Sequence, residues 1–175
     1  MPERPALLSA RTRLIILFSM TLVILVIVNG QIVIKEDIIE NGDTLLIRLA
    51  PRDPRSLLQG DYMALRYAMA DKVARAAQTD EVTDGRVIVA LAENGEASFV
   101  GLFDGQALVE NQRLLRFRQR GDSVRLASDA YFFEEGQWKT YADARFGELR
   151  VDEDGDAVLI GLRDREGRRL GEALH

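Results

Sequence analysis

The chain has 175 residues, of which 47% are apolar and 29% are charged, and its formal net charge is −5. It contains no cysteine, and its one histidine is the terminal His175, which excludes disulfides, thiolate zinc sites and catalytic triads built on histidine. This length is enough for one domain with a buried core. We therefore expect a single domain with neither a cofactor nor a metal site.

The first expected element is a membrane helix. Arg13 and Lys35 bracket an uncharged stretch of 21 residues, LIILFSMTLVILVIVNGQIVI. At ~1.5 Å per residue, a helix of this length covers about 31 Å, which matches the ~30 Å hydrocarbon core of a bilayer. No A-x-A-like cleavage site follows the stretch. We therefore predict an uncleaved anchor over residues 14–34, in contact with membrane lipid, rather than a cleaved signal peptide or a buried core helix.

Charges on the two sides of this stretch predict its orientation. Arg4, Arg11 and Arg13 precede it, whereas acidic residues dominate the segment that follows Lys35. Because positive residues stay on the cytoplasmic side, residues 1–13 are expected inside and the rest of the chain outside. Beyond position 34 the net charge is about −7, which is a poor match for phosphate backbones, so we expect no nucleic-acid binding.

Helical character continues through residues 35–42, a juxtamembrane segment in which Gly42 stands where a left-handed C′ residue would end the helix. The period then changes to two, which predicts strands over residues 43–50 and 62–70. In the second strand Tyr62 and Tyr67 fall on opposite faces, so at least one of them is expected in the core. Residues 71–79 are rich in helix formers.

The rest of the chain reads mainly as short strands. They are expected at residues 86–92 and 97–103, joined by an Asn94-Gly95 turn, then at 108–120, 130–133, 148–151 and 157–163. One helix is expected from Trp138 to near Phe146, with Trp138 and Tyr141 in the core. Residues 166–175 read as a polar tail. The order of elements predicts an α+β fold in which a transmembrane helix precedes a mainly antiparallel β domain, residues 43–165, with one or two short helices.

Three blocks of sequence carry a family resemblance. The motif Gly60-Asp61-Tyr62-Met63-Ala64-Leu65-Arg66-Tyr67 follows LAPRDPRSLLQ, and residues 131–151 precede AVLIGLRD. With these blocks the chain resembles the GDYXXLXY family, and all five fixed positions of the motif are present. The resemblance implies a bacterial inner-membrane protein with a single-pass anchor and a periplasmic domain. It implies multi-pass membrane proteins as partners, and it offers no catalytic residues.

The loop before the motif allows two interpretations. Arg52 and Arg55 surround a rigid proline together with Asp53, and arginine forks suit carboxylate or phosphate groups, which predicts an anion or peptide-terminus site. Alternatively the loop is structural, with Asp53 or Asp61 capping turns and Gly60 supplying a positive φ. We favour the structural interpretation. The fixed residues Tyr62, Leu65 and Tyr67 complete the candidate motif site.

Two further hypotheses concern chemistry. Ser56 with Lys72 as base would form an envelope hydrolase of the serine/lysine type, although nothing in their spacing requires it. The acidic residues Asp152, Asp154 and Asp156 alternate like calcium ligands, but Arg163 stands where an EF-hand has its glutamate, so a solvated hairpin turn is preferred. We expect no enzymatic activity. The favoured function is an accessory or interaction module that docks on multi-pass membrane proteins through DPRSLLQGDY.

Overall fold

The computed structural model describes residues 9–50, 62–121 and 123–171, and the chain divides into two compact units between Asp37 and Ile38. Apart from Ser9, helix α1 (Ala10–Asn41) accounts for the described part of the first unit, and it supplies the first residues of the second. The positions of the units relative to each other are not determined.

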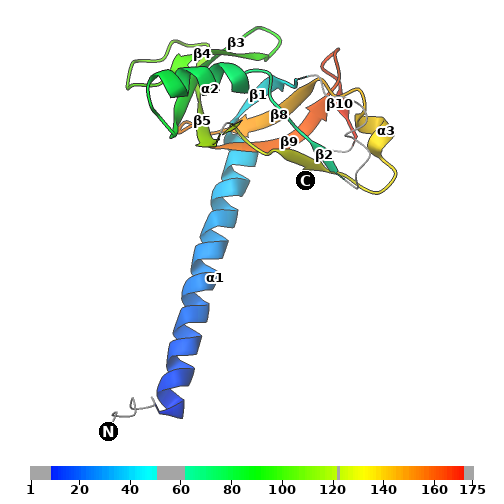
Figure 1. The fold of residues 1–175 in the computed structure, drawn as a ribbon. Helices are drawn as coiled ribbons and strands as arrows, with labels where there is room; N and C mark the ends of the chain where they lie inside the picture. The colour runs from blue at the N-terminus through cyan, green and yellow to red at the C-terminus, as the bar shows by residue number, and fades with distance from the viewer. Residues whose placement is uncertain (1–8, 51–61, 122, 172–175) are drawn as a thin grey trace. The chain divides into compact units, whose positions relative to one another are not determined.

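Helix α1 is a single long helix (Figure 1), and its uncharged stretch between Arg13 and Lys35 has apolar residues on every face. Ser9 caps its first turn, because the Ser9 hydroxyl accepts a hydrogen bond from the backbone N–H of Thr12 at 3.3 Å. Every side chain from Leu14 to Ile34 is exposed. By length and composition Arg11–Asn41 is able to cross a membrane. The helix predicted over 14–34 and its extension beyond Lys35 are thus one continuous element.

Gly42 ends the helix for a different reason from the predicted one. Its φ angle is not positive, so the expected left-handed C′ residue is wrong. Instead, a Cβ atom at this position would lie 2.5 Å from the carbonyl oxygen of Ile38 and 2.9 Å from that of Val151. Glycine is required here because the helix end and strand β8 (Phe146–Val151) approach too closely for any side chain.

Among the described residues the strands form two four-stranded sheets and one two-stranded sheet, and all sheet pairings are antiparallel. We call the first the β8 sheet, with the order β1 (Asp43–Arg48), β8 (Phe146–Val151), β9 (Ala157–Arg163) and β10 (Arg169–Leu170). The second is the β5 sheet, with the order β4 (Ala97–Leu102), β3 (Asp84–Leu91), β5 (Gln112–Arg120) and β6 (Ser123–Arg125). Strands β2 (Tyr62–Ala64) and β7 (Ala130–Phe132) form the third sheet. The predicted α+β class is confirmed.

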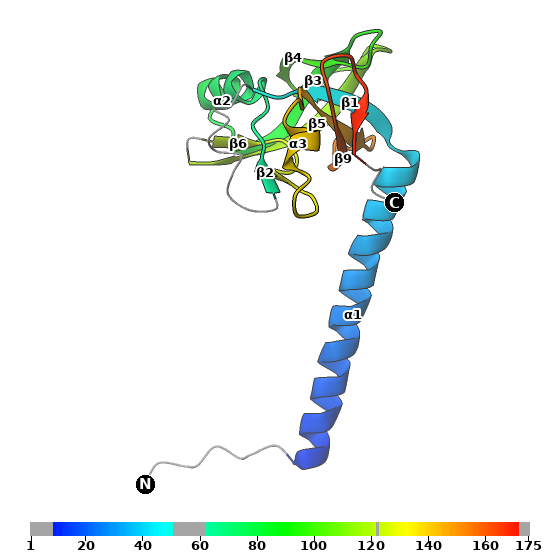
Figure 2. The same cartoon turned by 90° about the vertical axis from the view of Figure 1, so that its right-hand side faces the viewer.

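One apolar core joins the two larger sheets. It contains Leu45 and Leu149 from the β8 sheet and Val87 and Leu115 from the β5 sheet, all fully buried. Helix α2 (Ala70–Thr79) contacts β4 and β6 and adds the fully buried Val73 (Figure 2). A smaller core lies around Met63, Leu65, Tyr131, Tyr141, Ala144 and Leu162.

Each large sheet also binds a turn of the other. The turn between β3 and β4 accepts a hydrogen bond from β1, from the Leu46 N–H to the Gly95 carbonyl at 3.0 Å. The turn between β8 and β9 accepts one from β5, from the Arg116 N–H to the Gly155 carbonyl at 2.7 Å. The bidentate pair between Arg48 and Glu96 reinforces the first contact, with N···O distances of 2.9 and 3.0 Å.

Two predicted elements are shorter in the structure. The strand predicted over 62–70 ends at Ala64 because the chain changes partner: the Ala68 N–H donates to Arg48, outside the β2–β7 pair. The helix predicted from Trp138 is only α3 (Trp138–Tyr141), because the Arg145 N–H already donates to Arg163 in the β8 sheet. Trp138 is 44% exposed, so its predicted place in the core is wrong, whereas Tyr141 is buried.

Strand β10 lies within residues 166–175, the segment expected to be a polar tail. It pairs with β9 through Arg169 opposite Arg163 and Leu170 opposite Leu162. The ordered domain therefore extends at least to Leu170.

Candidate functional site: a groove lined by the motif

Part of the predicted site lies outside the described residues. This applies to Arg52, Asp53, Arg55, Ser56, Gly60 and Asp61. The structure does describe the last three fixed positions of the motif, Tyr62, Leu65 and Tyr67, together with Lys72 of the hydrolase hypothesis. The described part of the candidate site consists of Tyr62, Leu65 and Tyr67 and the residues that contact them.

The two motif tyrosines have different environments, which confirms that at least one is in the core, although Tyr67 lies beyond the end of β2 and strand parity is not the reason. Tyr67 is 3% exposed and belongs to the main core, whereas Tyr62 is 42% exposed. The Tyr62 ring packs against Phe132 on the paired strand β7, with centroids 5.8 Å apart. Leu65, between them, is buried in the smaller core.

Tyr67 is held by a hydrogen bond as well as by packing. Its hydroxyl donates to the Ser128 carbonyl oxygen at 2.9 Å, and its ring lies 3.2 Å from where a Cβ on Gly147 would be. Burial, together with the nearby Asp129 carboxylate, raises the pKa of Tyr67 far above its ordinary value of 10. Tyr67 is therefore a neutral hydrogen-bond donor that ties the motif to the segment before β7.

A groove of about 540 Å³ opens beside Leu65 and Tyr67. It lies between the start of α2 and the segment from β6 toward β7, and is lined by Leu65, Arg66, Tyr67, Ala70, Asp71, Ala74, Ser123, Val124, Arg125 and Asp129. We call it the motif groove. Three residues of the motif, Leu65, Arg66 and Tyr67, line this groove. The motif therefore contributes to the surface of the domain as well as to its core.

The motif groove combines an apolar floor with two ion pairs. Leu65, Tyr67 and Ala70 are buried at its base. Arg66 binds Asp71 at 2.7 Å, and Arg125 binds Asp129 at 2.5 Å, with all four charged side chains about half exposed. Because each positive charge has a negative partner, the groove has no net charge of its own. This combination suits a peptide segment that inserts an apolar side chain and hydrogen-bonds at the rim.

Lys72 does not meet the requirement for a catalytic base. A lysine base needs a desolvated ammonium group beside the nucleophile, and the Lys72 side chain on α2 is exposed. Ser56 lies outside the described residues. The hydrolase hypothesis therefore gains no support from the structure.

The acidic segment Asp152–Asp156 is a hairpin turn whose three aspartates make contacts within the domain. The Asp156 N–H donates to the Asp152 side chain at 2.8 Å, and Gly155 has a φ of +87°. Asp156 also pairs with Arg116 at 3.0 Å and Asp154 with Arg86 at 3.5 Å. Among the residues that the structure describes, no group of three or more potential ligand side chains is placed to hold a metal ion.

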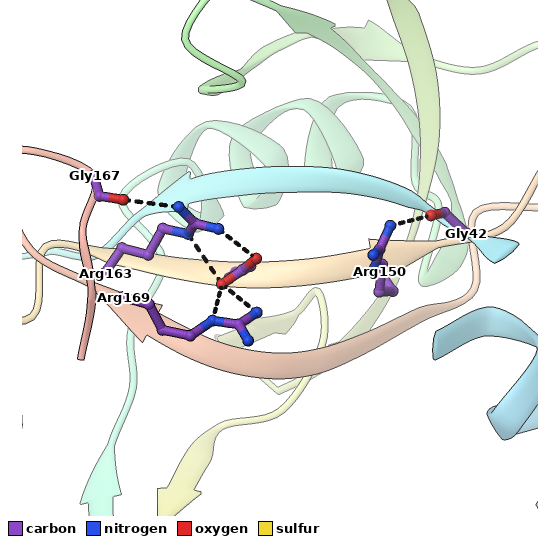
Figure 3. Close-up of polar contacts among 6 residues, drawn as sticks. Gly42, Arg150, Arg163, Gly167 and Arg169 are labelled. Atoms are coloured by element: carbon purple, nitrogen blue, oxygen red, sulfur yellow. Dashed lines mark hydrogen bonds and ion pairs between the residues drawn. The ribbon is translucent and has the colours of Figure 1, made fainter. Parts of the chain in front are cut away.

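A buried ion cluster in the β8 sheet was missed by the sequence reasoning (Figure 3). Glu148, 3% exposed, accepts hydrogen bonds from Arg163 at 3.0 and 2.7 Å and from Arg169 Nε at 2.9 Å. Arg163 also donates to the Gly167 carbonyl oxygen at 2.8 Å. We call these three side chains the Glu148 cluster. The spacing of these residues in the sequence does not predict the Glu148 cluster, because Glu148, Arg163 and Arg169 meet only when β9 pairs with both β8 and β10.

The Glu148 carboxylate remains ionised despite its burial. Desolvation alone would raise its pKa, but the hydrogen bonds and charges of Arg163 and Arg169 outweigh desolvation and hold the pKa below its ordinary value of 4.5. Gly161 lies opposite Glu148 on β9, and a Cβ there would only touch Arg169 Nε and Glu148 Oε2, each at 3.5 Å. The cluster fastens the C-terminal strand to the sheet.

Together these features define a class of protein: a small antiparallel α+β domain that follows an apolar helix long enough to cross a membrane. The chain belongs to the GDYXXLXY protein family, whose sequence profile matches residues 24–162 and so confirms the resemblance. No curated protein and no solved structure matches the chain.

Proposed function

We propose that this protein is an anchored module of the bacterial inner membrane, with its N-terminus in the cytoplasm and its domain in the periplasm. The observation that carries the anchor is α1, whose side chains from Leu14 to Ile34 are all exposed and nearly all apolar. Such a surface is stable in lipid and unfavourable in water. The orientation follows from Arg11 and Arg13 on one side and the acidic segment Glu36–Asp37 on the other.

Reporter fusions test the orientation. A phosphatase that is active only in the periplasm, fused after His175, is expected to be active, and a fluorescent protein that matures only in the cytoplasm is expected to be dark. The matched control inverts the flanks by replacing Arg11 and Arg13 with glutamate and Glu36 and Asp37 with arginine, which should exchange the two signals. A bright cytoplasmic reporter on the native chain would refute the assignment.

The module acts by binding a membrane partner rather than by catalysis. The motif groove supports this, because its apolar floor and charge-balanced rim suit a peptide segment, and a single-helix anchor confines the domain to the neighbourhood of other membrane proteins. The segment DPRSLLQGDY ends at Tyr62, the first described residue of the motif, and is also proposed to take part in docking; its residues 53–61 lie outside the described residues.

Photocrosslinking tests the docking site. A photoreactive side chain at Ala74, which lines the motif groove, is expected to capture a multi-pass membrane protein in living cells. The control places the same group at Gln78, which is on α2 and exposed but does not line the groove. Equal capture from both positions would show that the groove is not the docking site.

The hydrolase alternative has its own test. A serine-directed fluorophosphonate probe should leave the protein unlabelled. Labelling that disappears in both Ser56→Ala and Lys72→Ala, with the fold retained, would replace the proposed binding role by an enzymatic one.

A further inference from the structure

An amide side chain projects from the apolar surface of α1. Asn29 is exposed, and its Nδ2 donates to the Leu25 carbonyl oxygen of its own helix at 2.8 Å. That bond uses one of the two N–H groups. In the described part of the chain, the second N–H and the Oδ1 oxygen of Asn29 have no hydrogen-bond partner. The helix itself therefore satisfies only part of this amide.

The position of Asn29 makes this incomplete satisfaction costly. The inference rests on the proposed membrane anchor. Asn29 lies five residues before Ile34, the end of the uncharged stretch, which is about 7.5 Å along the helix axis. A short side chain at that depth contacts hydrocarbon, where an unpaired amide is unfavourable and a second polar group is the available remedy.

Asn29 is part of a seam rather than an isolated polar residue. Ser19, Leu22, Val26, Asn29 and Val33 follow one another at intervals of three, four, three and four residues. This spacing places them on one face of α1, and it is the repeat with which two helices pack in a left-handed crossing. All five side chains are exposed. Two of the five, Ser19 and Asn29, carry hydrogen-bonding groups.

We propose that α1 pairs with α1 of a second copy of this chain along this seam, which we call the Asn29 seam. A carboxamide carries both a donor and an acceptor, so two copies of Asn29 satisfy each other across a two-fold axis. The same flanking charges orient both copies, so the helices run parallel and position 29 of one faces position 29 of the other. The Ser19 hydroxyls face each other in the same way, about 15 Å further along the helix.

Cysteine crosslinking tests the pairing directly, because the native chain contains no cysteine. The purified full chain is reconstituted into phosphatidylcholine vesicles and oxidised. Leu22→Cys and Val26→Cys, on the seam, are expected to form disulfide-linked dimers. Ile24→Cys lies between them in depth but on the opposite face, and is expected to remain monomeric. Equal crosslinking at all three positions, or none at any, overturns the proposal.

The contribution of the amide has a matched control in the same helix. Asn29→Leu is expected to lower the dimer-to-monomer ratio about fivefold at a fixed protein-to-lipid ratio. Gln31→Leu removes an amide from the opposite face and is expected to leave the ratio unchanged. Equal losses in both variants would contradict a specific seam.

Two further readouts separate this inference from the proposals on which it depends. Alkaline carbonate extraction reports insertion: a chain released from the vesicles would refute the anchor and the pairing together, whereas a retained monomer refutes only the pairing. Crosslinking of Leu22→Cys to another protein in cells, with no dimer in vesicles, would assign the seam to a partner's helix and overturn pairing with a second copy.

Discussion

The two large sheets use charged side chains in opposite ways. In the β8 sheet a carboxylate is buried, and Glu148 is satisfied by two arginines from β9 and β10. In the β5 sheet the corresponding ion pairs lie at the surface, where Arg116 and Arg118 of β5 pair with Asp156 and Asp84 and stay 40% and 57% exposed. Beneath them the β5 sheet presents fully buried apolar side chains such as Leu115.

Ion pairs of similar geometry therefore contribute differently to stability, depending on how far they are exposed to water. An exposed pair is weakened by water and salt, and its median contribution is about 0–1 kcal/mol. Once a buried pair has formed, removing one partner leaves an uncompensated charge and costs about 3–5 kcal/mol. Removing a charge should therefore lower the free energy of unfolding strongly in the β8 sheet and weakly in the β5 sheet. In the β5 sheet, truncation of a buried apolar side chain should have the larger effect.

The largest effect is expected for Glu148→Gln. The substitution keeps the shape of the side chain but leaves the Arg163 and Arg169 guanidinium groups facing each other without a carboxylate. We expect the free energy of unfolding to fall by about 4 kcal/mol. Thermal unfolding of the full chain in mild detergent, followed by circular dichroism, measures the loss. A change below about 1 kcal/mol would show that the cluster is solvated.

The next effect is expected for Leu115→Ala in the β5 sheet. Leu115 is fully buried in the core shared by both sheets, so truncation creates a cavity and should cost about 3 kcal/mol. The same unfolding measurement applies. If Leu115→Ala were harmless while Glu148→Gln unfolded the protein, the shared core would not be the main source of stability in this sheet.

The stability that the Glu148 cluster contributes is expected to depend on pH, because the pKa of Glu148 is lowered in the folded protein. The pKa of Glu148 lies below 4.5 in the folded protein and near its ordinary value in the unfolded chain. Its contribution to stability is therefore complete above about pH 5 and is lost as the pH falls through the folded-state pKa. We expect the stability difference between the native protein and Glu148→Gln to shrink in acid. A difference that stays constant from pH 7 to pH 3 would contradict the assigned pKa shift.

A smaller effect is expected for Tyr67→Phe. The ring still fills the core, but the Ser128 carbonyl loses its donor, and the expected cost is about 1 kcal/mol. Tyr62→Phe, which alters the exposed tyrosine of the same motif, serves as the control and should leave the unfolding temperature unchanged. Equal shifts would indicate that the two motif tyrosines have similar environments, against the structure.

The smallest effect is expected for Arg118→Gln, which removes an exposed ion pair with Asp84 at 3.7 Å. The free energy of unfolding should change by less than about 0.5 kcal/mol. A loss comparable to that of Glu148→Gln would abolish the distinction between the two sheets.

Much of the fold could be predicted from local patterns. The uninterrupted apolar stretch specified α1, alternation specified most strands, and Asn94-Gly95 identified the β3–β4 hairpin, in which Gly95 has a φ of +80°. Predictions failed where distant strands decide the outcome. Helical spacing after Trp138 extended α3 too far, because pairing of Arg145 with Arg163 overrides it.

The candidate site was less predictable for the same reason. The motif pointed to Leu65 and Tyr67, and both line the motif groove. Its opposite wall, with Arg125 and Asp129, comes from a segment about 60 residues away that carries no recognisable pattern. The Glu148 cluster depends on two strand pairings at once, so a single sequence offers no signal for it.

The turns that cross between the β8 and β5 sheets have a consequence for how this domain tolerates change. Gly95 and Gly155 each present a carbonyl to a strand of the other sheet, so the length of each turn is fixed by a neighbour far away in the chain. Insertions should be accepted in the exposed connection at residues 104–111 and rejected at either turn. Because each sheet binds a turn of the other, the two sheets should unfold in a single transition. Neither sheet should remain folded as a separate fragment.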